Sequence, residues 1–551
     1  MTTSPNRSHI GLFRALTTLL FIIILIRVAF LMLNSSSPER RYEDPAVAER
    51  VERGTILDRN GRILAIQTPY WGVYFHLNAI DDLPFVSEVV APFVQMSSAQ
   101  IAERAASYTT YAQIKERIDE QTAQELAVAL SKNRLQNQVT IEKRQGRTWP
   151  AFFHGVQTIG FTNTAGEGIE GIELSQERYL NPWPEVGESL VTYGDEITLT
   201  LDLDIQYAVD VQLQAIASEW ESEWATAIVL DARNGDILAL GSWPWYDANL
   251  FGRSKAEERR NNAITQMSEP GSVFKLFSLA SILNAGEADT TTPFFCDGSY
   301  TFWAGGKPIT ISCSSPHGSV DAETMISKSC NGAISHWALQ TDTDAFYQTL
   351  VDLGFTTSWD IDLPSRARSL IADPKTWSAR SKPTIAFGQE LMTSALHLAV
   401  AATALGPSGE LLTPHLILRR NSGSDGSLLY ERVRTPVAQV LDPAVTQTIR
   451  DGMALATQEG TGTRARVDGI KVGIKTGTAQ TLNPETGSYV DGALYASALA
   501  IVPIDEPRYI IYVGSHNPGG SDIWGANIAA PAIGEIIRSL ASQGKLIVSK
   551  E

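Results

Sequence analysis

The sequence predicts an α+β protein in which an antiparallel sheet is flanked by helices. Three observations lead to this class. The C-terminal part of the chain begins with a strand pattern and ends with three more, and helical patterns lie between them. Two Asn-Gly pairs each separate apolar runs, which is typical of β-hairpins. Of the 551 residues, 43% are apolar and 19% are charged, so the chain can bury the cores of two or three domains.

The first element is an apolar stretch at residues 15–33, ALTTLLFIIILIRVAFLML. As a helix it would span about 28 Å, close to the thickness of a bilayer core. Arg7 and Arg14 precede it, which favours a cytoplasmic tail at residues 1–14. We therefore expect a single transmembrane anchor.

A cleaved signal peptide is the alternative, and Ser35 and Ser37 are small enough for a cleavage site. The apolar stretch is, however, longer than the ~7–15 residues of a usual signal core. Both interpretations place everything after residue 40 outside the cytoplasm. The polar residues 34–50 are interpreted as a linker.

A first soluble segment is predicted at residues 51–195. It opens with RGTILDRNGRILA, where Asn60-Gly61 predicts a hairpin turn with positive φ at both positions. Residues 100–135 have a polar, helical pattern. No catalytic group of residues is apparent in this segment.

A second soluble segment is predicted at residues 196–545. The strand pattern TLTL precedes Ile205, Val209 and Leu213, whose spacing of four predicts a helix. Another Asn-Gly hairpin is predicted at Asn234. Near the end, KVGIKTGTAQTL, YASALAIVP and YIIYVGS predict three successive strands, and AAPAIGEIIRSLAS predicts a closing helix.

Charge and composition narrow the classes of ligand. The net charge of -17 argues against a nucleic-acid partner, because phosphate binding needs a basic surface. There are three cysteines, so the chain is not a disulfide scaffold. Cys296 and Cys313 are able to pair in an oxidising compartment, and three buried thiols, with Cys330, are the other interpretation. The eight histidines show no HExxH or similar ligand spacing, so no metal site and no cofactor are predicted.

Ser272 and Lys275 form the first candidate catalytic pair. Pro270 and Gly271 interrupt the chain before the apolar run VFKLFSLASIL, so Ser272 is expected at a helix N-terminus. Lys275, three residues later, is expected on the same helical face. A serine hydroxyl needs a nearby base, and a lysine serves when burial and positive neighbours lower its pKa. An isolated SxxK tetrad is a weak signal, because it often arises by chance.

Ser329 and Asn331 form an SxN motif, 57 residues after Ser272. The serine is a candidate for proton transfer and the asparagine for binding a substrate amide. Both residue types are also common as helix caps, so the motif alone is weak.

The third motif is Lys475-Thr476-Gly477-Thr478, within a strand pattern. Glycine in a strand often marks the close approach of a ligand backbone. The lysine and the two threonine hydroxyls suit a carboxylate, and an ordinary strand is the alternative. In this order, SxxK, SxN and KTG are the signature of penicillin-binding proteins and serine β-lactamases.

The chain resembles a class B penicillin-binding protein, a monofunctional peptidoglycan D,D-transpeptidase, from the N-terminal stretch to the last helix. The resemblance is carried by RGTILDRNGRILA, GIEGIELSQERYL, GDEITLTLDLDIQ, EPGSVFK, HGSVDAETMISKSCN, AFGQELMTSALHLA, EGTGTRARV and IKTGTAQ. It departs from the family at Ile474, where glycine is usual, and at residues 393–396. The resemblance implies an elongated pedestal, or dimerisation domain, at residues 51–195 and a transpeptidase domain at residues 196–545.

The resemblance also implies roles for the motif residues. Ser272 would attack the carbonyl of the penultimate D-Ala of a stem peptide, and Lys275 would take the hydroxyl proton. Ser329 and Lys475 would help to move a proton to the leaving D-Ala amine. Asn331 would hold the peptide.

The third motif would bind the end of the substrate. Thr476 and Thr478, on either side of Gly477, would bind the terminal carboxylate. The backbone N–H groups of Ser272 and Thr478 would form the oxyanion hole, at roughly 3 kcal/mol per donor. β-Lactams would acylate the same serine, and no cofactor is implied.

Several related functions stay open at the level of the sequence. A class A β-lactamase uses a glutamate in a Glu-x-x-Leu-Asn element after the SxN motif, and the matching string that starts at Glu177 precedes Ser272. A D,D-carboxypeptidase, an elongation-type transpeptidase and a non-enzymatic β-lactam sensor or division scaffold are further alternatives. The septal type is favoured by KTGTAQ and by the lack of a long pedestal insertion.

The resemblance places the protein in the inner (cytoplasmic) membrane of a bacterium, with the catalytic domain in the periplasm. Its expected partners are stem peptides that end in D-Ala-D-Ala, a separate membrane glycosyltransferase and other division proteins.

Overall fold

The computed structural model describes residues 21–22, 50–183, 191–364, 366–482 and 488–548, together with Thr18. Nearly all of the predicted tail, anchor and linker lies outside these residues. Within the described ranges, no helix is long and apolar enough to cross a membrane.

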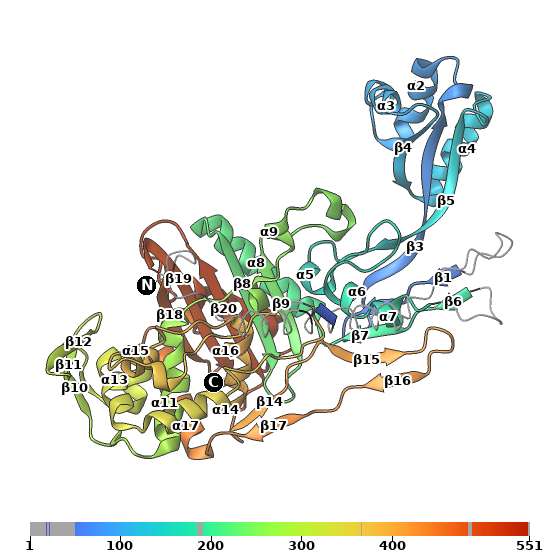
Figure 1. The fold of residues 1–551 in the computed structure, drawn as a ribbon. Coiled ribbons are helices and arrows are strands. Elements are labelled where there is room, and N and C mark those ends of the chain that lie inside the picture. The colour runs from blue at the N-terminus through green and yellow to red at the C-terminus, as the bar shows by residue number, and fades with distance from the viewer. Residues whose placement is uncertain are drawn as a thin grey trace, which may run out of the picture. The chain divides into compact units, whose positions relative to one another are not determined.

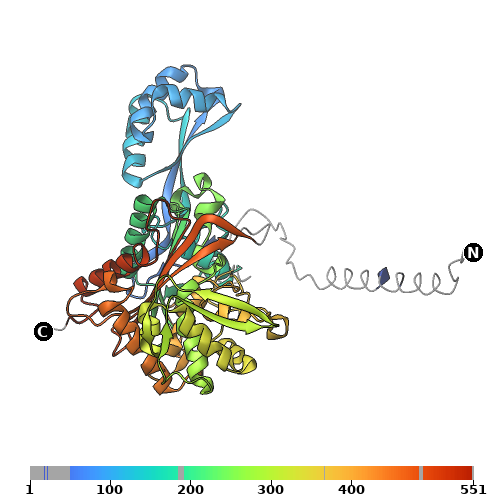
Figure 2. The same ribbon diagram turned by 90° about the vertical axis from the view of Figure 1, so that its left-hand side faces the viewer.

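The C-terminal part is built on a five-stranded antiparallel sheet in the order β18-β19-β20-β8-β9 (Figure 1). Figure 2 shows the strands near the C-terminus, in orange and red, from a second side. Its strands are β8 (Trp224–Asp231), β9 (Ile237–Trp243), β18 (Gly473–Leu482), β19 (Tyr489–Val502) and β20 (Tyr509–His516). The three strands predicted near the C-terminus are confirmed. The sheet pairs β20 with β8, which lie nearly 300 residues apart in the chain.

Helices cover both faces of this sheet (Figure 1). On one face lie α8 (Leu203–Trp220) and α18 (Ala529–Ser542), both as predicted. Ile205, Val209 and Leu213 of α8 are buried in the core on that face. The opposite face carries α10 (Asn262–Thr265) and α16 (Ala395–Ala401). The buried apolar side chains of the two faces stabilise this layered arrangement by about 1.5–3 kcal/mol each.

A helical region adjoins the second face of the sheet. Its elements are η3 (Gly271–Phe274), α11 (Lys275–Ala285), α12 (Ala322–Lys328), α13 (Asn331–Gln340), α14 (Thr343–Asp352), α15 (Ser381–Ala386) and α17 (Pro443–Glu459). Two small antiparallel pairs interrupt it. They are β10 (Phe294–Cys296) with β13 (Gly318–Val320), and β11 (Ser299–Ala304) with β12 (Lys307–Ser312).

A second sheet joins the two predicted soluble segments. Its order is β16-β15-β7-β2-β3-β4, and β5 also pairs with β3. Its strands are β2 (Ile56–Leu57), β3 (Ile63–His76), β4 (Tyr111–Ile118), β5 (Val139–Thr148), β7 (Glu196–Leu199), β15 (Ile417–Asn421) and β16 (Leu428–Glu431). Because β7 pairs in parallel with β2, backbone hydrogen bonds cross the predicted boundary at residue 196.

Three helices pack on the part of this sheet formed by β3, β4 and β5: α2 (Leu83–Val94), α3 (Ser98–Ala106) and α4 (Glu120–Lys132). Apart from short 3-10 helices, the remaining elements of the described residues are β1 (Arg50–Glu52), α5 (Val156–Ile159), α6 (Gly171–Ser175), α7 (Glu177–Leu180), β6 (Val191–Tyr193), α9 (Ala256–Arg259), β14 (Glu410–Leu412) and β17 (Pro436–Gln439).

The prediction of helix throughout residues 100–135 is wrong in its middle. α3 ends at Ala106, and β4 then pairs with β3 before α4 begins. Ala112 and Ile114 of β4 are fully buried, so alternate side chains face the core. Polar residues between them concealed this two-residue period, and true helices on either side reinforced the helical pattern.

Hairpins occur where the Asn-Gly pairs predict them, but with a different turn. Gly61 and Gly235 each have φ of 82°, whereas neither asparagine has a positive φ. In the first turn, the N–H groups of Asn60 and Arg62 donate to Asp58 Oδ1 at 2.9 and 2.8 Å. The aspartate side chain therefore stabilises the turn, and the left-handed conformation is needed only at glycine.

Candidate active site

Ser272 lies in the single turn η3 that leads directly into α11. Gly271 before it has φ of 53° and donates its N–H to Gly388 O at 3.0 Å. Phe274 and Phe277, one turn apart, are fully buried against Phe355. This packing anchors η3 and α11, and it leaves Ser272 partly exposed at the surface of the helical region.

Lys275 Nζ contacts the other three polar residues of the first two motifs, Ser272, Ser329 and Asn331. It lies 2.9 Å from Ser272 Oγ, 3.0 Å from Ser329 Oγ, 2.7 Å from Ser329 O and 2.6 Å from Asn331 Oδ1. The Lys275 side chain is fully buried. The structure therefore brings SxxK and SxN together around one amine.

Two of these four contacts define where the Lys275 N–H groups point. Ser329 O and Asn331 Oδ1 accept hydrogen bonds and cannot donate them. The Asn331 amide orientation is fixed by its Nδ2, which donates to Ser312 O at 2.9 Å. A neutral lysine has two N–H groups and one lone pair, so the lone pair is directed to the hydroxyls, of which Ser272 is the closer. This geometry suits removal of the Ser272 proton.

Ser329 links the two buried lysines of the site. Its backbone is left-handed, with φ of 61°, at the end of α12. Its Oγ accepts from Lys475 Nζ at 3.0 Å, the same distance as from Lys275 Nζ. Burial lowers the pKa of Lys275 to about 7. Burial and then the charge of Lys275 hold the pKa of Lys475 well below its usual value.

The KTGT motif occupies β18, the edge strand of the five-stranded sheet, next to η3. The Thr476 hydroxyl donates to Thr461 Oγ1 at 2.8 Å, and Thr478 Oγ1 accepts from the Gly525 N–H at 3.1 Å. A Cβ at Gly477 would lie 2.9 Å from Pro270 O, so glycine allows the strand to approach η3. Thr478, unlike Thr476, lines the cleft beside Ser272.

That cleft has a volume of about 290 Å³. It contains Ser272, Asn331 and Thr478 from the three motifs. It also contains residues that sequence reasoning did not single out: Thr310, Ile311 and Ser312 of β12, and Arg380, Phe387 and Gln389. Phe387 and Gln389 belong to the quoted stretch AFGQ, but a lone arginine and a polar hairpin strand give no sequence signal.

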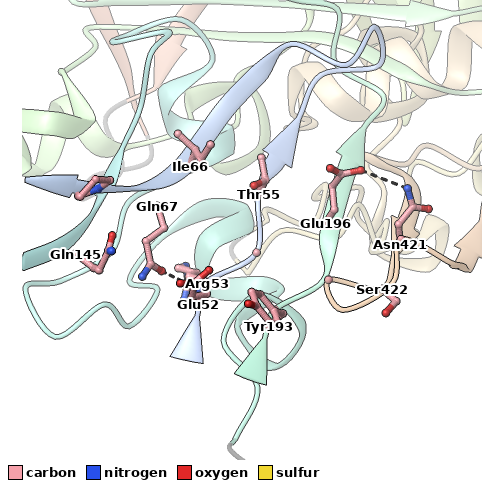
Figure 3. A pocket seen from close by; sticks show the side chains of 15 residues that line it. Glu52, Arg53, Thr55, Ile66, Gln67, Gln145, Tyr193, Glu196, Asn421 and Ser422 are labelled. Atoms are coloured by element: carbon pink, nitrogen blue, oxygen red, sulfur yellow. Dashed lines mark hydrogen bonds between the residues drawn. The ribbon is translucent and has the colours of Figure 1, made fainter. Parts of the chain in front are cut away.

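Glu177, the residue of the lactamase-like string, does not line this cleft. It is in α7 and accepts from Arg53 Nη1 at 2.7 Å and from the Gly168 N–H at 2.9 Å. A larger cavity of about 540 Å³, shown in Figure 3, is lined by residues of both soluble segments, among them Arg53, Gln67 and Asn421. None of the motif residues lines it, so it is separate from the candidate active site.

All three cysteines are free thiols. The Sγ atoms of Cys296 and Cys313 are 3.6 Å apart, well beyond the ~2.05 Å of a disulfide bond. With His317 and Cys330 they form a group whose ligand atoms all lie within 4.8 Å of one another. The absence of a metal site was predicted from histidine spacing alone. Such spacing does not detect a group of three cysteines and one histidine.

Comparison with known proteins identifies the family of the chain. Residues 225–538 match the family described as "Penicillin binding protein transpeptidase domain", and residues 48–189 match "Penicillin-binding Protein dimerisation domain". The chain is 30% identical over 512 residues to "Probable peptidoglycan D,D-transpeptidase PenA" of Neisseria gonorrhoeae, which covers 88% of this chain and 83% of that protein. It is 25% identical over 520 residues to "Peptidoglycan D,D-transpeptidase FtsI" of Escherichia coli K12, with 88% and 82% covered.

Among solved structures, penicillin binding protein 3 from Mycobacterium tuberculosis, complexed with ampicillin, has a similar fold. The TM-score is 0.72 at 23% identity, over 91% of this chain and 97% of that chain. The transpeptidase match alone covers more than half of the 551 residues. The chain therefore belongs to the penicillin-binding protein transpeptidase family.

Proposed function

We propose that this protein is a septal-type peptidoglycan D,D-transpeptidase that cross-links stem peptides through an acyl-enzyme on Ser272. One observation carries the proposal. The buried amine of Lys275 lies 2.9 Å from Ser272 Oγ and also contacts two oxygens that can only accept, Ser329 O and Asn331 Oδ1. In its neutral form it donates to these two oxygens and turns its lone pair toward the hydroxyls. A base held in this way activates a serine for attack on a carbonyl carbon.

Acylation starts when Ser272 Oγ bonds to the carbonyl carbon of the penultimate D-Ala and its proton passes to Lys275. The bond to the terminal D-Ala breaks only when its nitrogen receives a proton. Ser329 Oγ contacts both lysine amines at 3.0 Å, so it relays a proton from Lys275 or Lys475 to that nitrogen. The terminal D-Ala leaves, and Ser272 holds the remaining peptide as an ester.

Residues in the cleft and on the adjoining strand β18 bind the substrate and stabilise the charge that develops during acylation. Asn331 binds the peptide, and Thr476, Gly477 and Thr478 bind its terminal carboxylate along β18. The backbone N–H groups of Ser272 and Thr478 stabilise the oxyanion, each by roughly 3 kcal/mol. The amine of a second stem peptide then attacks the ester, forms the cross-link and returns the proton to Ser272.

A β-lactam should acylate Ser272 and remain bound. In the part of the chain that the structure describes, the lining of the cleft includes no carboxylate to activate water. Deacylation then lacks the ~10²–10⁴-fold that a general base contributes. After penicillin treatment, intact-mass spectrometry should show one adduct that persists for tens of minutes and maps to the Ser272 peptide.

The matched control is Ser272→Ala, which should abolish the adduct. Wild-type labelling of this variant would remove Ser272 from its role. Rapid return of the wild-type mass with steady drug hydrolysis would identify a β-lactamase instead. Incubation with a stem peptide and an acceptor amine separates the remaining alternatives: a cross-linked product identifies a transpeptidase, hydrolysis alone a carboxypeptidase, and no turnover a sensor or scaffold.

The septal role rests on the KTGTAQ stretch and on the compact first segment, and it is supported by the similarity to proteins named FtsI and PenA. Depletion of the protein in its host tests it. Filamentous cells are expected for a division enzyme, and round cells would assign the enzyme to elongation instead.

We also propose that residues 15–33 anchor the chain in the bacterial inner membrane, with the catalytic domain in the periplasm. The apolar stretch and the preceding arginines support this location. A membrane glycosyltransferase and division proteins would bind through the anchor and the dimerisation domain. A chain that starts near Tyr42 should be released from the membrane fraction and still be labelled by penicillin. Membrane retention of this chain, or loss of labelling while it stays folded, would contradict the assignment of the stretch as an anchor alone.

A further inference from the structure

Four side chains of the kind that bind zinc meet beside the SxN motif. They come from four positions in the chain: the end of β10 (Cys296), the residue after β12 (Cys313), the residue before β13 (His317) and the N-cap of α13 (Cys330). Their ligand atoms all lie within 4.8 Å of one another. Cys296 and Cys330 are fully buried, and the other two are partly buried.

The distances in this group match a tetrahedral zinc site. With Zn–S of about 2.3 Å and Zn–N of about 2.05 Å, tetrahedral angles require S···S of about 3.8 Å and S···N of about 3.6 Å. The Sγ of Cys313 lies 3.6 Å from that of Cys296 and 3.8 Å from that of Cys330. Cys296 Sγ lies 3.6 Å from His317 Nδ1. These three distances match the tetrahedral values, and all four ligand atoms lie within 4.8 Å of one another, close enough to share one ion.

The surrounding backbone holds these ligands in place. The N–H groups of Gly332 and Ala333 donate to the sulfurs of Cys313 and Cys330 at 3.3 and 3.4 Å. Hydrogen bonds of this kind stabilise metal-bound thiolates. The backbone N–H of His317 donates to Cys296 O at 3.1 Å, so two ligands are fixed to each other by the β10–β13 pair.

A disulfide explains this arrangement less well. Any single disulfide would leave one thiol of the three unpaired and would not account for His317. A Cys₃His set is complete as a four-coordinate structural site, and thiolate ligands select zinc over magnesium or calcium.

We propose that Cys296, Cys313, His317 and Cys330 bind one structural Zn²⁺. Binding releases the three thiol protons and uses neutral His317 Nδ1, so the bound centre carries a net charge of about -1. All four coordination positions are filled by the protein, so the ion has no position for water or substrate.

The proposed zinc site adjoins the candidate active site and would fix the positions of its residues. Cys330 lies between Ser329 and Asn331, and Cys313 follows Ser312, whose carbonyl accepts from Asn331 Nδ2 at 2.9 Å. The ion therefore ties the end of β12 to the SxN motif. This link holds Asn331 Oδ1 and Ser329 O, the two acceptors that orient the Lys275 amine.

Metal analysis of the full-length protein, purified in detergent without chelator, tests the site directly and does not depend on the transpeptidase activity. About one zinc per chain is expected by mass spectrometry of the elements. Cys313→Ala and His317→Ala should each lose most of it. His336→Ala is the matched control, because His336 is a half-buried histidine of the same region that contacts Tyr300 and is not in the ligand group.

Thiol alkylation and chelation of the wild-type protein test the site even if the variants fail to fold. Iodoacetamide should leave the three thiols unmodified until a strong chelator is added, and then label all three. Penicillin labelling should slow after chelation and recover with Zn²⁺ but not with Mg²⁺. Absence of metal after growth and purification with added zinc would overturn the proposal. So would a mass 2 Da low from a disulfide among these cysteines, or zinc retained in both ligand variants.

Discussion

At the scale of single residues, the proposed reactivity of Ser272 depends on the protonation of two buried lysines, Lys275 and Lys475. Both amines contact Ser329 Oγ at 3.0 Å, so two positive charges there would repel each other in a site screened from water. Burial favours the neutral form of each lysine. A large fraction of the Lys275 amine beside the serine is therefore neutral near pH 7, where a free lysine would be almost fully protonated.

This predicts the pH dependence of acylation. The pKa of Lys275 is lowered to about 7, so below pH 7 the amine is protonated and cannot take the Ser272 proton. The second-order rate of penicillin acylation should rise about tenfold per pH unit up to pH 7 and level off above it. Stopped-flow or quenched labelling between pH 5 and 9 measures this profile.

Glu269 provides the control, because burial also raises its pKa to about 7 and it lies three residues before Ser272. The Tyr489 hydroxyl donates to its carboxylate at 3.2 Å. Glu269→Gln removes this ionisation and should keep the midpoint near pH 7. Loss of the transition in this variant would assign it to Glu269 and would contradict the role of Lys275.

Among the elements, the contact between β18 and η3 sets the position of the KTGT motif. A Cβ at Gly477 would lie 2.9 Å from Pro270 O, 2.9 Å from Val273 Cγ2 and 3.0 Å from Ser497 Oγ. Two of these distances are shorter than side-chain contacts normally allow, and one of the atoms is backbone. The strand can therefore lie this close to the nucleophile only with glycine.

Gly477→Ala should move β18 away from Ser272. A displacement of about 1 Å costs up to roughly 100-fold in rate, so we expect acylation to slow by about 10–100-fold. Gly252→Ala is the control, because its Cβ would meet no atom within 4 Å and its φ is not left-handed. The prediction fails if Gly477→Ala reacts like Gly252→Ala while both remain folded by circular dichroism.

At the scale of the whole molecule, a buried ion network joins parts of the first segment that lie far apart in the chain. Glu173 accepts from Arg53 Nε and from Arg147 Nε, both at 2.7 Å, and its side chain is fully buried. Arg147 also donates to Gly54 O at 2.7 Å, next to the shared sheet. One carboxylate thus fixes two guanidinium groups on β5 and on the chain before β2.

Glu173→Gln removes the carboxylate that Arg53 and Arg147 share, and the side chains of both arginines are at least 95% buried. Arg53 keeps its ion pair with Glu177, whereas Arg147 loses its ionic partner in this network. Breaking a buried ion pair costs about 3–5 kcal/mol when one charge remains buried without its partner, as the Arg147 guanidinium does here. The midpoint of thermal unfolding should fall by several degrees. Asp505→Asn breaks the exposed pair with Lys471 and should cost at most about 1 kcal/mol. Calorimetry measures the midpoint of thermal unfolding of both variants. An equal fall in the two midpoints would show that the buried network adds no more stability than the exposed pair.

The sequence by itself determined the family and most of the elements, and it predicts Ser272 as the nucleophile. SxxK, SxN and KTG are local strings whose order is diagnostic, and the spacing of Ile205, Val209 and Leu213 predicts α8 because side-chain periodicity is a local property. The polar strand β4 escaped detection, since its pairing with β3, and not its composition, makes it a strand.

Only the tertiary structure decided which distant groups meet. That Lys275 reaches both Ser329 O and Asn331 Oδ1, and that Cys330 meets Cys296 and His317, depends on how hairpins and helices pack. No periodicity records such contacts, because they join segments whose separation in the chain is unrelated to their distance in space. The sequence therefore predicts the type of reaction. The packing of the fold determines the pKa of Lys275 and brings the three cysteines and His317 together.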